Sequence, residues 1–268
     1  MNRIDAAFQR ARAEHRAAFM PFLTAGDPDL ATTAALIEEM ARRGADLIEL
    51  GIPYSDPVAD GPTIQASYVR ALSGGLRIAQ VFEMLRDVRT RCDAPILTMV
   101  SYSIVTSAGA ENYFARAAAA GTDGVIIPDL PADEAGPVIR LAESVGLHPV
   151  LLVAPTTPDA RIRYIVRRSK GFIYYIAVSG TTGARSELPP DLGEHIARVK
   201  AATNKPVAVG FGVSRPEHVA AVARLADGVI VGSAIVRKVH EFAGRPRAEL
   251  VSGVGDFVAQ LAAGVTAK

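Results

Sequence analysis

The chain has 268 residues, 49% of them hydrophobic, and a formal net charge of +1. This charge balance excludes the basic surface that favours binding to nucleic acid or to an anionic membrane. Cys92 is the only cysteine, which excludes an intrachain disulfide bond and a cysteine-based metal site and indicates a reducing compartment. Residues Met1 to Phe19 lack the apolar block of a signal peptide, and no stretch reaches the roughly 18 apolar residues of a membrane span, so we expect a cytoplasmic protein.

The first predicted element is a short amphipathic helix, Ile4 to Glu14, which precedes every predicted strand and could plug the floor of a barrel. Short apolar runs then recur about every 25 to 30 residues, the scale of one βα unit. Because these runs are continuous and do not alternate with polar residues, they predict strands buried on both faces, as in a parallel sheet covered by helices. The eight runs are Ala18 to Thr24, Asp46 to Leu50, Pro95 to Val100, Gly124 to Ile127, Pro149 to Val153, Phe172 to Ile176, Val207 to Val209 and Val229 to Val231.

Stretches with helical spacing separate the predicted strands. Examples are Leu30, Ala34, Ile37 and Ala41, then Ile78, Val81, Leu85 and Val88, then Val138, Leu141, Ala142 and Val145, and last Val219, Val222 and Ala223. Eight βα units without a low-complexity linker predict one domain over residues 1–268, an α/β (β/α)8 TIM barrel with an extra N-terminal helix. A doubly wound open sheet uses the same alternation and is the alternative architecture.

Glu49 lies inside the otherwise apolar run Asp46 to Leu50. A buried carboxylate is costly unless it is paired or used, because burial disfavours its charged form and raises its pKa. Active sites of TIM barrels lie at the C-terminal ends of the strands, so this position favours a catalytic carboxylate. The alternative is a structural glutamate that bonds backbone amides or a neighbouring hydroxyl.

The long loop Ile52 to Pro62 follows this strand and carries Asp56 and Asp60. Because the loop is rich in Pro, Gly and Asp, either aspartate taken alone is typical of a turn or a helix cap. However, Asp60 lies on the loop that leaves Glu49. The two carboxylates could therefore face one pocket and divide acid and base roles.

Three glycine segments follow the last three predicted strands: Gly180 to Gly183, Gly210 to Ser214 and Gly232 to Ser233. Glycines allow backbone amides to approach an anion, and this part of a TIM barrel is the usual phosphate seat, so the segments predict phosphate binding. The alternative is that they serve only tight turns. A dinucleotide fingerprint starting at Gly210 fails because Arg215 stands where the third glycine would be.

The sequence lacks the residues for metal-assisted catalysis and for Schiff-base catalysis. The histidines form no ligand spacing, so we expect no metal site. Lys170 and Lys205 precede their predicted strands, while Lys200 and Lys238 belong to predicted helices, so no lysine is placed for a Schiff base. Acid and base catalysis without a cofactor remains.

Four aromatic residues lie at or near predicted strand ends and are candidate walls of a pocket. They are Phe22, Tyr102, Tyr174 and Phe211. Aromatic side chains spaced through a barrel are also typical of a packed core, which is the alternative for each.

Six segments together resemble the tryptophan synthase α subunit family. They are Pro21 to Pro28, Glu49 to Pro57, Asp60 to Gln65, Pro128 to Pro131, Thr182 to Arg185 and Gly210 to Ser214. The resemblance runs from the first helix to the end of the chain, and its most specific part is Glu49 to Gln65. It implies a retro-aldol cleavage of indole-3-glycerol phosphate to indole and glyceraldehyde 3-phosphate in tryptophan biosynthesis, within an α2β2 complex with a β subunit and without a cofactor.

The resemblance also implies roles for single residues. Glu49 and Asp60 match the catalytic pair, and Tyr174 matches a tyrosine near the catalytic glutamate. Phe22, Tyr102 and Phe211 match residues around the indole, and the phosphate seat is matched by Gly183, Gly212, Gly232 and Ser233, with Thr182 as a further substrate contact. Asp56 and Pro57 are expected at the interface with the β subunit.

One departure concerns the loop after Tyr102. The family usually carries Asn there, often followed by Pro, whereas this chain reads Ser103-Ile104-Val105. In the family this loop lies at the partner interface, so the departure bears on β-subunit binding more than on the chemistry. Two alternative functions stay open: a freestanding lyase that releases indole without a partner, and a non-catalytic barrel that only binds a phosphorylated ligand.

Overall fold

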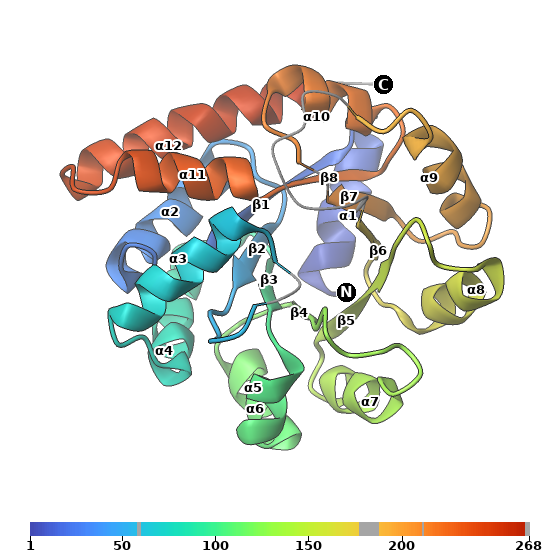
Figure 1. Ribbon diagram of the computed structural model, residues 1–268, viewed down its shortest axis with the longest axis horizontal. Helices are drawn as coiled ribbons and strands as arrows, with labels where there is room; N and C mark the ends of the chain where they lie inside the picture. The colour runs from blue at the N-terminus through green and yellow to red at the C-terminus, as the bar shows by residue number, and fades with distance from the viewer. Residues whose placement is uncertain (58–59, 177–187, 211, 266–268) are drawn as a thin grey trace.

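The computed structural model describes residues 1–57, 60–176, 188–210 and 212–265. Eight strands close into a barrel in sequence order, and the barrel is completed by parallel pairing of the last strand with the first. The helices form a layer around the strands (Figure 1). The predicted TIM barrel is therefore confirmed, and the open sheet is wrong.

The strands agree with the predicted apolar runs to within one or two residues at each end. They are β1 (Ala18–Thr24), β2 (Ile48–Gly51), β3 (Ile96–Met99), β4 (Gly124–Ile126), β5 (His148–Val153), β6 (Ile173–Ile176), β7 (Val207–Gly210) and β8 (Gly228–Val231). The helices are α1 (Arg3–Ala13), α2 (Leu30–Arg42), α3 (Pro62–Ser73), α4 (Ile78–Arg89), α5 (Tyr102–Ser107), α6 (Ala110–Ala119), α7 (Gly136–Ser144), α8 (Asp159–Arg168), α9 (Leu192–Lys200), α10 (Pro216–Ala223), α11 (Ser233–Glu241) and α12 (Arg247–Ala262), followed by the short 3-10 turn η1 (Ala263–Val265).

Strand β2 shows how the sequence directs Glu49 into the barrel. Ile48 and Leu50 pack in the large core between strands and helices, whereas Leu47 packs in the separate core inside the barrel. Side chains alternate between the two faces of a strand, so Glu49 points inward like Leu47. An apolar run with one carboxylate therefore places that carboxylate among the inward-facing side chains.

Helix α1 closes the N-terminal end of the barrel. Ile4 and Phe8 belong to the interior core, and the rings of Phe8 and Phe172 lie 5.3 Å apart between centroids. Gly124 leaves room for this helix, because a Cβ atom there would lie 2.9 Å from Ile4 Cδ1 and 2.7 Å from the carbonyl oxygen of His148. The prediction that the first helix plugs the barrel floor is confirmed.

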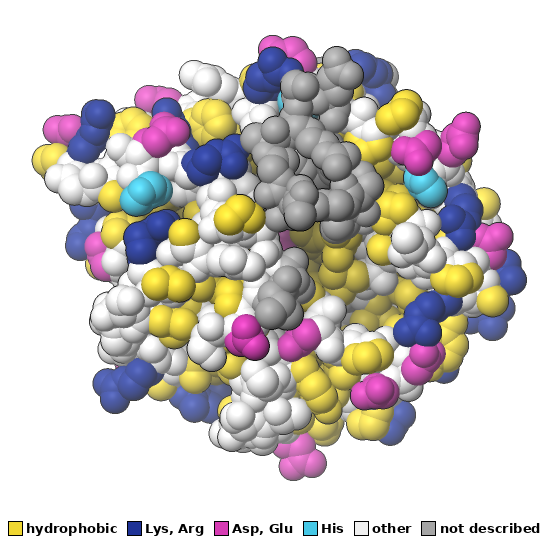
Figure 2. Space-filling model, in the orientation of Figure 1, with side chains coloured by type: hydrophobic (Ala, Val, Ile, Leu, Met, Phe, Trp, Pro, Cys, Tyr) yellow, Lys and Arg dark blue, Asp and Glu magenta, His cyan; other side chains and the backbone are white. Residues whose placement is uncertain are grey.

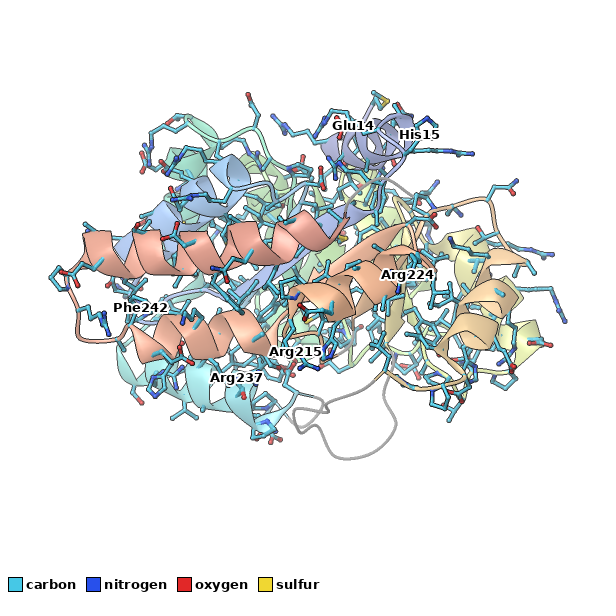
Figure 3. All side chains as sticks on the ribbon, turned by 90° about the horizontal axis from the view of Figure 1, so that it is seen from above. Glu14, His15, Arg215, Arg224, Arg237 and Phe242 are labelled. Carbon is cyan, nitrogen blue, oxygen red and sulfur yellow. The ribbon has the colours of Figure 1, made fainter. Side chains whose placement is uncertain are left out.

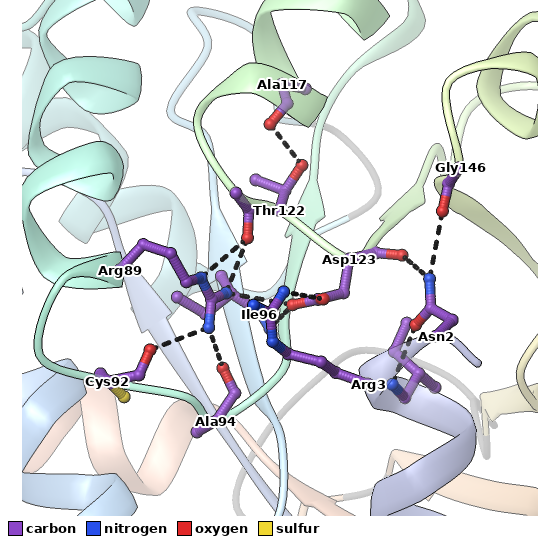
Figure 4. Close-up of polar contacts among 12 residues, drawn as sticks. Asn2, Arg3, Arg89, Cys92, Ala94, Ile96, Ala117, Thr122, Asp123 and Gly146 are labelled. Carbon is purple, nitrogen blue, oxygen red and sulfur yellow. Dashed lines mark hydrogen bonds and ion pairs between the residues drawn. The ribbon is translucent and has the colours of Figure 1, made fainter.

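Aspartates at the starts of three even-numbered strands bond the amides of the strands before them. The bonds run from Phe19 N–H to Asp46 (2.8 Å), from Ile96 N–H to Asp123 (2.9 Å) and from Val207 N–H to Asp227 (3.0 Å). Asp123 also pairs with Arg3 at 3.1 Å and Arg89 at 3.0 Å, which ties α1 to the barrel floor (Figure 4). These carboxylates satisfy backbone donors at the strand ends. Asp46, which was predicted inside the second strand, lies two residues before β2.

One described helix, Arg247–Val265, is long and apolar enough to span a membrane by length and composition. It packs against α2 and α11, and Leu250, Val254, Val258 and Leu261 are buried there. Its apolar side chains thus belong to the outer layer of the barrel.

Candidate active site

Most of the predicted site residues lie at the C-terminal ends of the strands, on the face opposite α1. Figure 3 shows Arg215, which precedes α10, and Arg237, on α11, on the other side of the barrel from Glu14 and His15 at the end of α1. Figure 2 shows hydrophobic side chains to the right of and below the centre of this face. This arrangement predicts a site that holds an apolar group at the mouth of the barrel.

Glu49 is the buried carboxylate of this site. Its exposed fraction is 1%, and among the described residues neither carboxylate oxygen has a hydrogen-bond partner. Burial raises the pKa of Glu49 to about 8, and the charge of Asp60 acts in the same direction. The Tyr174 hydroxyl acts in the opposite direction, but it does not reach hydrogen-bond geometry with Glu49, so burial dominates.

An unpartnered glutamate with a raised pKa is stable as the neutral acid. At pH 7 the Glu49 carboxyl group therefore carries a proton that it can give away. The alternative was a structural glutamate held by backbone amides or a hydroxyl. The described residues do not support it, because neither carboxylate oxygen of Glu49 has a hydrogen-bond partner among these residues.

Two aromatic residues, Phe22 and Tyr174, lie beside Glu49. Phe22 on β1 is paired in register with Glu49, and its side chain is buried. The ring extends over Gly51, where a Cβ atom would lie 2.4 Å from Phe22 Cζ and 2.8 Å from the Tyr68 hydroxyl oxygen. A side chain at Gly51 would displace both rings, so glycine there allows them to line the site.

Tyr174 points into the barrel from β6. It belongs to the interior core with Phe172, whose ring lies 6.4 Å away between centroids. Gly210 on the neighbouring β7 makes room for it, since a Cβ atom there would lie 2.8 Å from the Tyr174 hydroxyl oxygen. Burial first, and then the charges of Glu49 and Asp60, raise the pKa of Tyr174 well above its ordinary value, so the phenol is neutral.

Asp60 lies just before α3 and is held by three hydrogen bonds. The Tyr54 hydroxyl donates to its Oδ2 at 3.3 Å, its backbone N–H donates to the carbonyl oxygen of Pro57 at 3.1 Å, and the Gln65 side-chain amide donates to its carbonyl oxygen at 2.8 Å. The loop thus presents a partly buried carboxylate on a fixed backbone.

The pKa of the Asp60 carboxyl is raised to about 6 by burial, while the hydrogen bond from Tyr54 lowers it and the charge of Asp129 raises it. Asp60 is itself partly buried. With Glu49 at about 8, the two pKa values lie on opposite sides of neutral pH. At pH 7 the site holds one protonated and one ionised carboxyl group.

Asp129 and Tyr102 join two neighbouring loops at the rim of the site. The carboxylate of Asp129 accepts a hydrogen bond from the backbone N–H of Tyr102 at 2.8 Å and from the Ser101 hydroxyl at 2.7 Å. Tyr102 is the first residue of α5, and its partly buried side chain packs on the core between strands and helices. The structure does not group Tyr102 with Phe22, so its contact with a substrate stays a prediction.

Gly232 and Ser233 form the start of α11. Gly232 is the N-cap residue, Ser233 begins the helix, and the first turn contains no acidic side chain. An N-terminus of this kind favours an anion. A Cβ atom on Gly232 would lie 3.6 Å from Phe22 Cβ, so the start of α11 borders the aromatic wall.

The remaining predicted residues divide into two groups. Asp56 is exposed and Pro57 is partly buried on the loop before Asp60, while Gly212 is exposed at the end of β7. Thr182, Gly183 and Phe211 lie outside the described residues.

The sequence matches the profile of one protein family, described as tryptophan synthase alpha chain, over residues 8–263. The chain belongs to this family. A tryptophan synthase alpha chain from Geobacter sulfurreducens is 46% identical over 261 residues, which cover 97% of this chain and 98% of the relative.

Solved structures of tryptophan synthase have the same fold. The alpha subunit from Legionella pneumophila matches with a TM-score of 0.90 and 34% identity, over 99% of this chain and 98% of that one. The tryptophan synthase of Mycobacterium tuberculosis matches with a TM-score of 0.89 and 36% identity, over 98% of each chain.

Sequence reasoning assigned no role to four residues that lie at the site of this alpha chain family member: Tyr54, Gln65, Tyr68 and Asp129. Tyr54 and Gln65 lie in the segment that carries the family resemblance most specifically. Gln65 and Tyr68 are three residues apart on α3, a spacing that puts them on one face of a helix. This spacing, taken together with the loop from Ile52 to Pro62 before α3, is the sequence signal that could have identified Gln65 and Tyr68 as site residues.

Proposed function

We propose that this chain cleaves indole-3-glycerol phosphate to indole and glyceraldehyde 3-phosphate by a retro-aldol reaction. The observation that carries the proposal is the pair of carboxyl groups: Glu49 has a pKa of about 8 and Asp60 one of about 6. One is a proton donor and the other an anion at neutral pH, and Phe22 and Tyr174 line the space beside them.

Glu49 acts first as a general acid. It protonates C3 of the indole, which turns the ring into an indoleninium cation and makes it an electron sink. The ionised Glu49 then takes the proton from the hydroxyl group on the glycerol carbon bonded to C3. The carbon–carbon bond breaks, its electron pair restores the aromatic indole, and the hydroxyl-bearing carbon becomes the aldehyde, so Glu49 ends protonated as it began.

Asp60 stabilises the cation. Protonation at C3 moves positive charge to the ring nitrogen, and an ionised carboxylate that accepts a hydrogen bond from this N–H stabilises the charge as it develops. The fixed backbone of Asp60 supports this role because little reorganisation is needed during the reaction.

The phosphate group is bound at the start of α11 and at Gly212, in the segment between β7 and α10. Support comes from Gly232 and Ser233 at an N-terminus without acidic residues, and from exposed Gly212, where a Cβ atom would meet none of the described atoms within 4 Å. Backbone amides there can approach a phosphate dianion. Phe22 lies between this seat and Glu49, as a substrate with an indole at one end and a phosphate at the other requires.

A β subunit receives the indole, in an α2β2 complex. The support is family membership together with the loop that runs from exposed Asp56 and Pro57 to Asp60. A loop that carries both a docking surface and a catalytic carboxylate can couple binding of the partner to the competence of the site.

We also propose that residues 1–268 form one domain that works in the cytoplasm. Closure of the barrel between β1 and β8 and the family match over residues 8–263 support a single unit. The single, buried cysteine suits a reducing compartment.

The experiment is to incubate the purified chain with indole-3-glycerol phosphate, with and without its cognate β subunit, and to measure indole. We expect slow release by the chain alone and faster release with the partner. Equal rates in both would favour a freestanding lyase, and no indole in either would favour a barrel that only binds a phosphorylated ligand.

A further inference from the structure

Tyr54 makes a hydrogen bond to the carboxylate of Asp60, with 3.3 Å between its hydroxyl oxygen and Oδ2. Among the described residues, no other side chain donates a hydrogen bond to this carboxylate. A partly buried anion is costly unless donors point at it, because burial removes water from it. The Tyr54 hydroxyl supplies such a donor.

The ring of Tyr54 is held in place by its neighbours. It packs against the cluster of Phe22, Ile64, Tyr68 and Val236, and its centroid lies 5.6 Å from that of Tyr68 with the planes tilted by 56°. Tyr68 is 1% exposed and belongs to α3. Packing against Tyr68 therefore fixes the ring that carries the Tyr54 hydroxyl.

The backbone of Asp60 is fixed separately by Gln65. The side-chain amide of Gln65 donates to the carbonyl oxygens of Asp60 at 2.8 Å and of Pro57 at 3.1 Å, which fastens both ends of the segment before α3. What remains adjustable is the side chain of Asp60, and Tyr54 is the group that contacts it.

We propose that Tyr54 is a positioning residue of the lyase reaction, whose hydroxyl holds the Asp60 carboxylate in the orientation and charge state that the indole N–H requires. This inference rests on the proposed function. It assigns to Tyr54 no contact with the reacting atoms, since it acts through Asp60.

Charged and titratable groups face Asp60 from several elements. Glu49 lies on β2, Tyr68 on α3, Asp129 after β4 and Tyr174 on β6, while exposed Asp56 lies on the same loop. Burial and the charge of Asp129 raise the pKa of Asp60, and the hydrogen bond from Tyr54 is the effect that lowers it. Loss of this hydroxyl should therefore raise the pKa of Asp60 above about 6.

The test is Tyr54→Phe, which keeps the ring and removes only the hydroxyl. The Asp60 carboxyl is titrated by carbon-13 NMR in substrate-free protein, with its signal assigned by its absence in Asp60→Asn. We expect the pKa of Asp60 to rise by about 0.5 to 1 pH unit in Tyr54→Phe. The acid limb of kcat/KM for indole release, measured with the cognate β subunit, should move to higher pH by the same amount.

Tyr113→Phe is the control, because it removes a buried hydroxyl that has no hydrogen-bond partner among the described residues and lies on α6, away from Asp60. We expect its acid limb and its Asp60 titration to stay where the wild-type protein has them. The ionisation of the substrate phosphate is common to all variants and cancels in the comparison.

An unchanged Asp60 titration in Tyr54→Phe, or an equal shift in Tyr113→Phe, would overturn the role of Tyr54. Failure of the proposed function looks different. In that case Asp60→Asn would release indole at the wild-type rate, or no variant would release indole, while the NMR titration would still report on Tyr54.

Discussion

Phe22 and Glu49 are paired across strands β1 and β2, so an aromatic ring lies beside the buried carboxyl group of the barrel. The ring of Phe22 occupies the space that a side chain at Gly51 would fill. An apolar wall next to an acid removes water from it and keeps it protonated. The same contact thus suits the proposed indole pocket and adds to the burial that raises the pKa of Glu49.

Burial of Glu49 should lower the free energy of unfolding by an amount that depends on pH. Its pKa in the folded protein, about 8, exceeds the ordinary value for a glutamate, so the folded state binds more protons than the unfolded state between these two values. Stability therefore falls as pH rises through this window. Glu49→Gln cannot titrate and should be more stable than wild type by about 1 to 3 kcal/mol at pH 8.5, with little difference at pH 5.

Urea denaturation of both proteins at pH 5, 7 and 8.5 measures this difference. Glu83→Gln, which changes an exposed glutamate on α4, is the control and should show no such trend. A stability difference for Glu49→Gln that is the same at all three pH values would be inconsistent with a neutral Glu49.

Asp60→Asn should lower kcat by on the order of 10²-fold, because an amide supplies no negative charge to the indoleninium cation. Its fold should persist, since the backbone bonds from Gln65 do not involve the carboxylate. Steady-state indole release gives kcat, and Asp87→Asn on the exposed face of α4 controls for loss of a surface charge. Full activity in Asp60→Asn would rule out the electrostatic role.

Gly212→Asp should weaken binding of phosphate compounds. Gly212 is exposed, and its Cβ position meets none of the described atoms within 4 Å, so the barrel should tolerate a side chain there. A carboxylate beside the phosphate dianion should reduce the affinity for glycerol 3-phosphate by roughly tenfold or more. Calorimetry measures it, and Gly212→Asn, of the same size without the charge, is the matched control. If both variants bind equally well, the phosphate lies elsewhere.

Asp56→Ala should reduce activation by the β subunit more than it reduces the slow rate of the isolated chain. Coupling of about 1 to 3 kcal/mol corresponds to roughly 5 to 150-fold activation. Sedimentation with the cognate β subunit measures binding, and indole release with and without it measures activation. Asp87→Ala, an exposed change on α4, should leave both as they are. A β subunit that neither sediments with the chain nor speeds cleavage would contradict the partner proposal.

The sequence predicted those features that depend on local pattern. Continuous apolar runs predicted the strands, and the position of Glu49 two residues after Leu47 is enough to turn its side chain into the barrel. The early amphipathic helix was correctly predicted as a plug, and its apolar residues Ile4 and Phe8 are buried in the interior core. Each of these follows from the periodicity of a single element.

Contacts between loops of different βα units could not be predicted in the same way. Asp129, after β4, affects the pKa of Asp60, before α3, although about 70 residues separate them in sequence, because the parallel pairing of β2 with β3 and of β3 with β4 brings their loops to one edge. The hydrogen bond from Tyr54 to Asp60 depends on how one loop folds back on itself. Asp46 was predicted within a strand, but its carboxylate bonds the amide of Phe19 on β1, a pairing that sequence alone does not specify.

Indole formation by wild-type protein and by Glu49→Gln, measured side by side under single-turnover conditions with the β subunit present, tests the role of Glu49 most directly. We expect Glu49→Gln to bind indole-3-glycerol phosphate with near-normal affinity and to form indole slower by on the order of 10²-fold or more, because the amide can neither give the proton to C3 nor take one from the hydroxyl. Indole formation by Glu49→Gln at a rate close to that of the wild type would contradict the assignment of Glu49 as the catalytic acid.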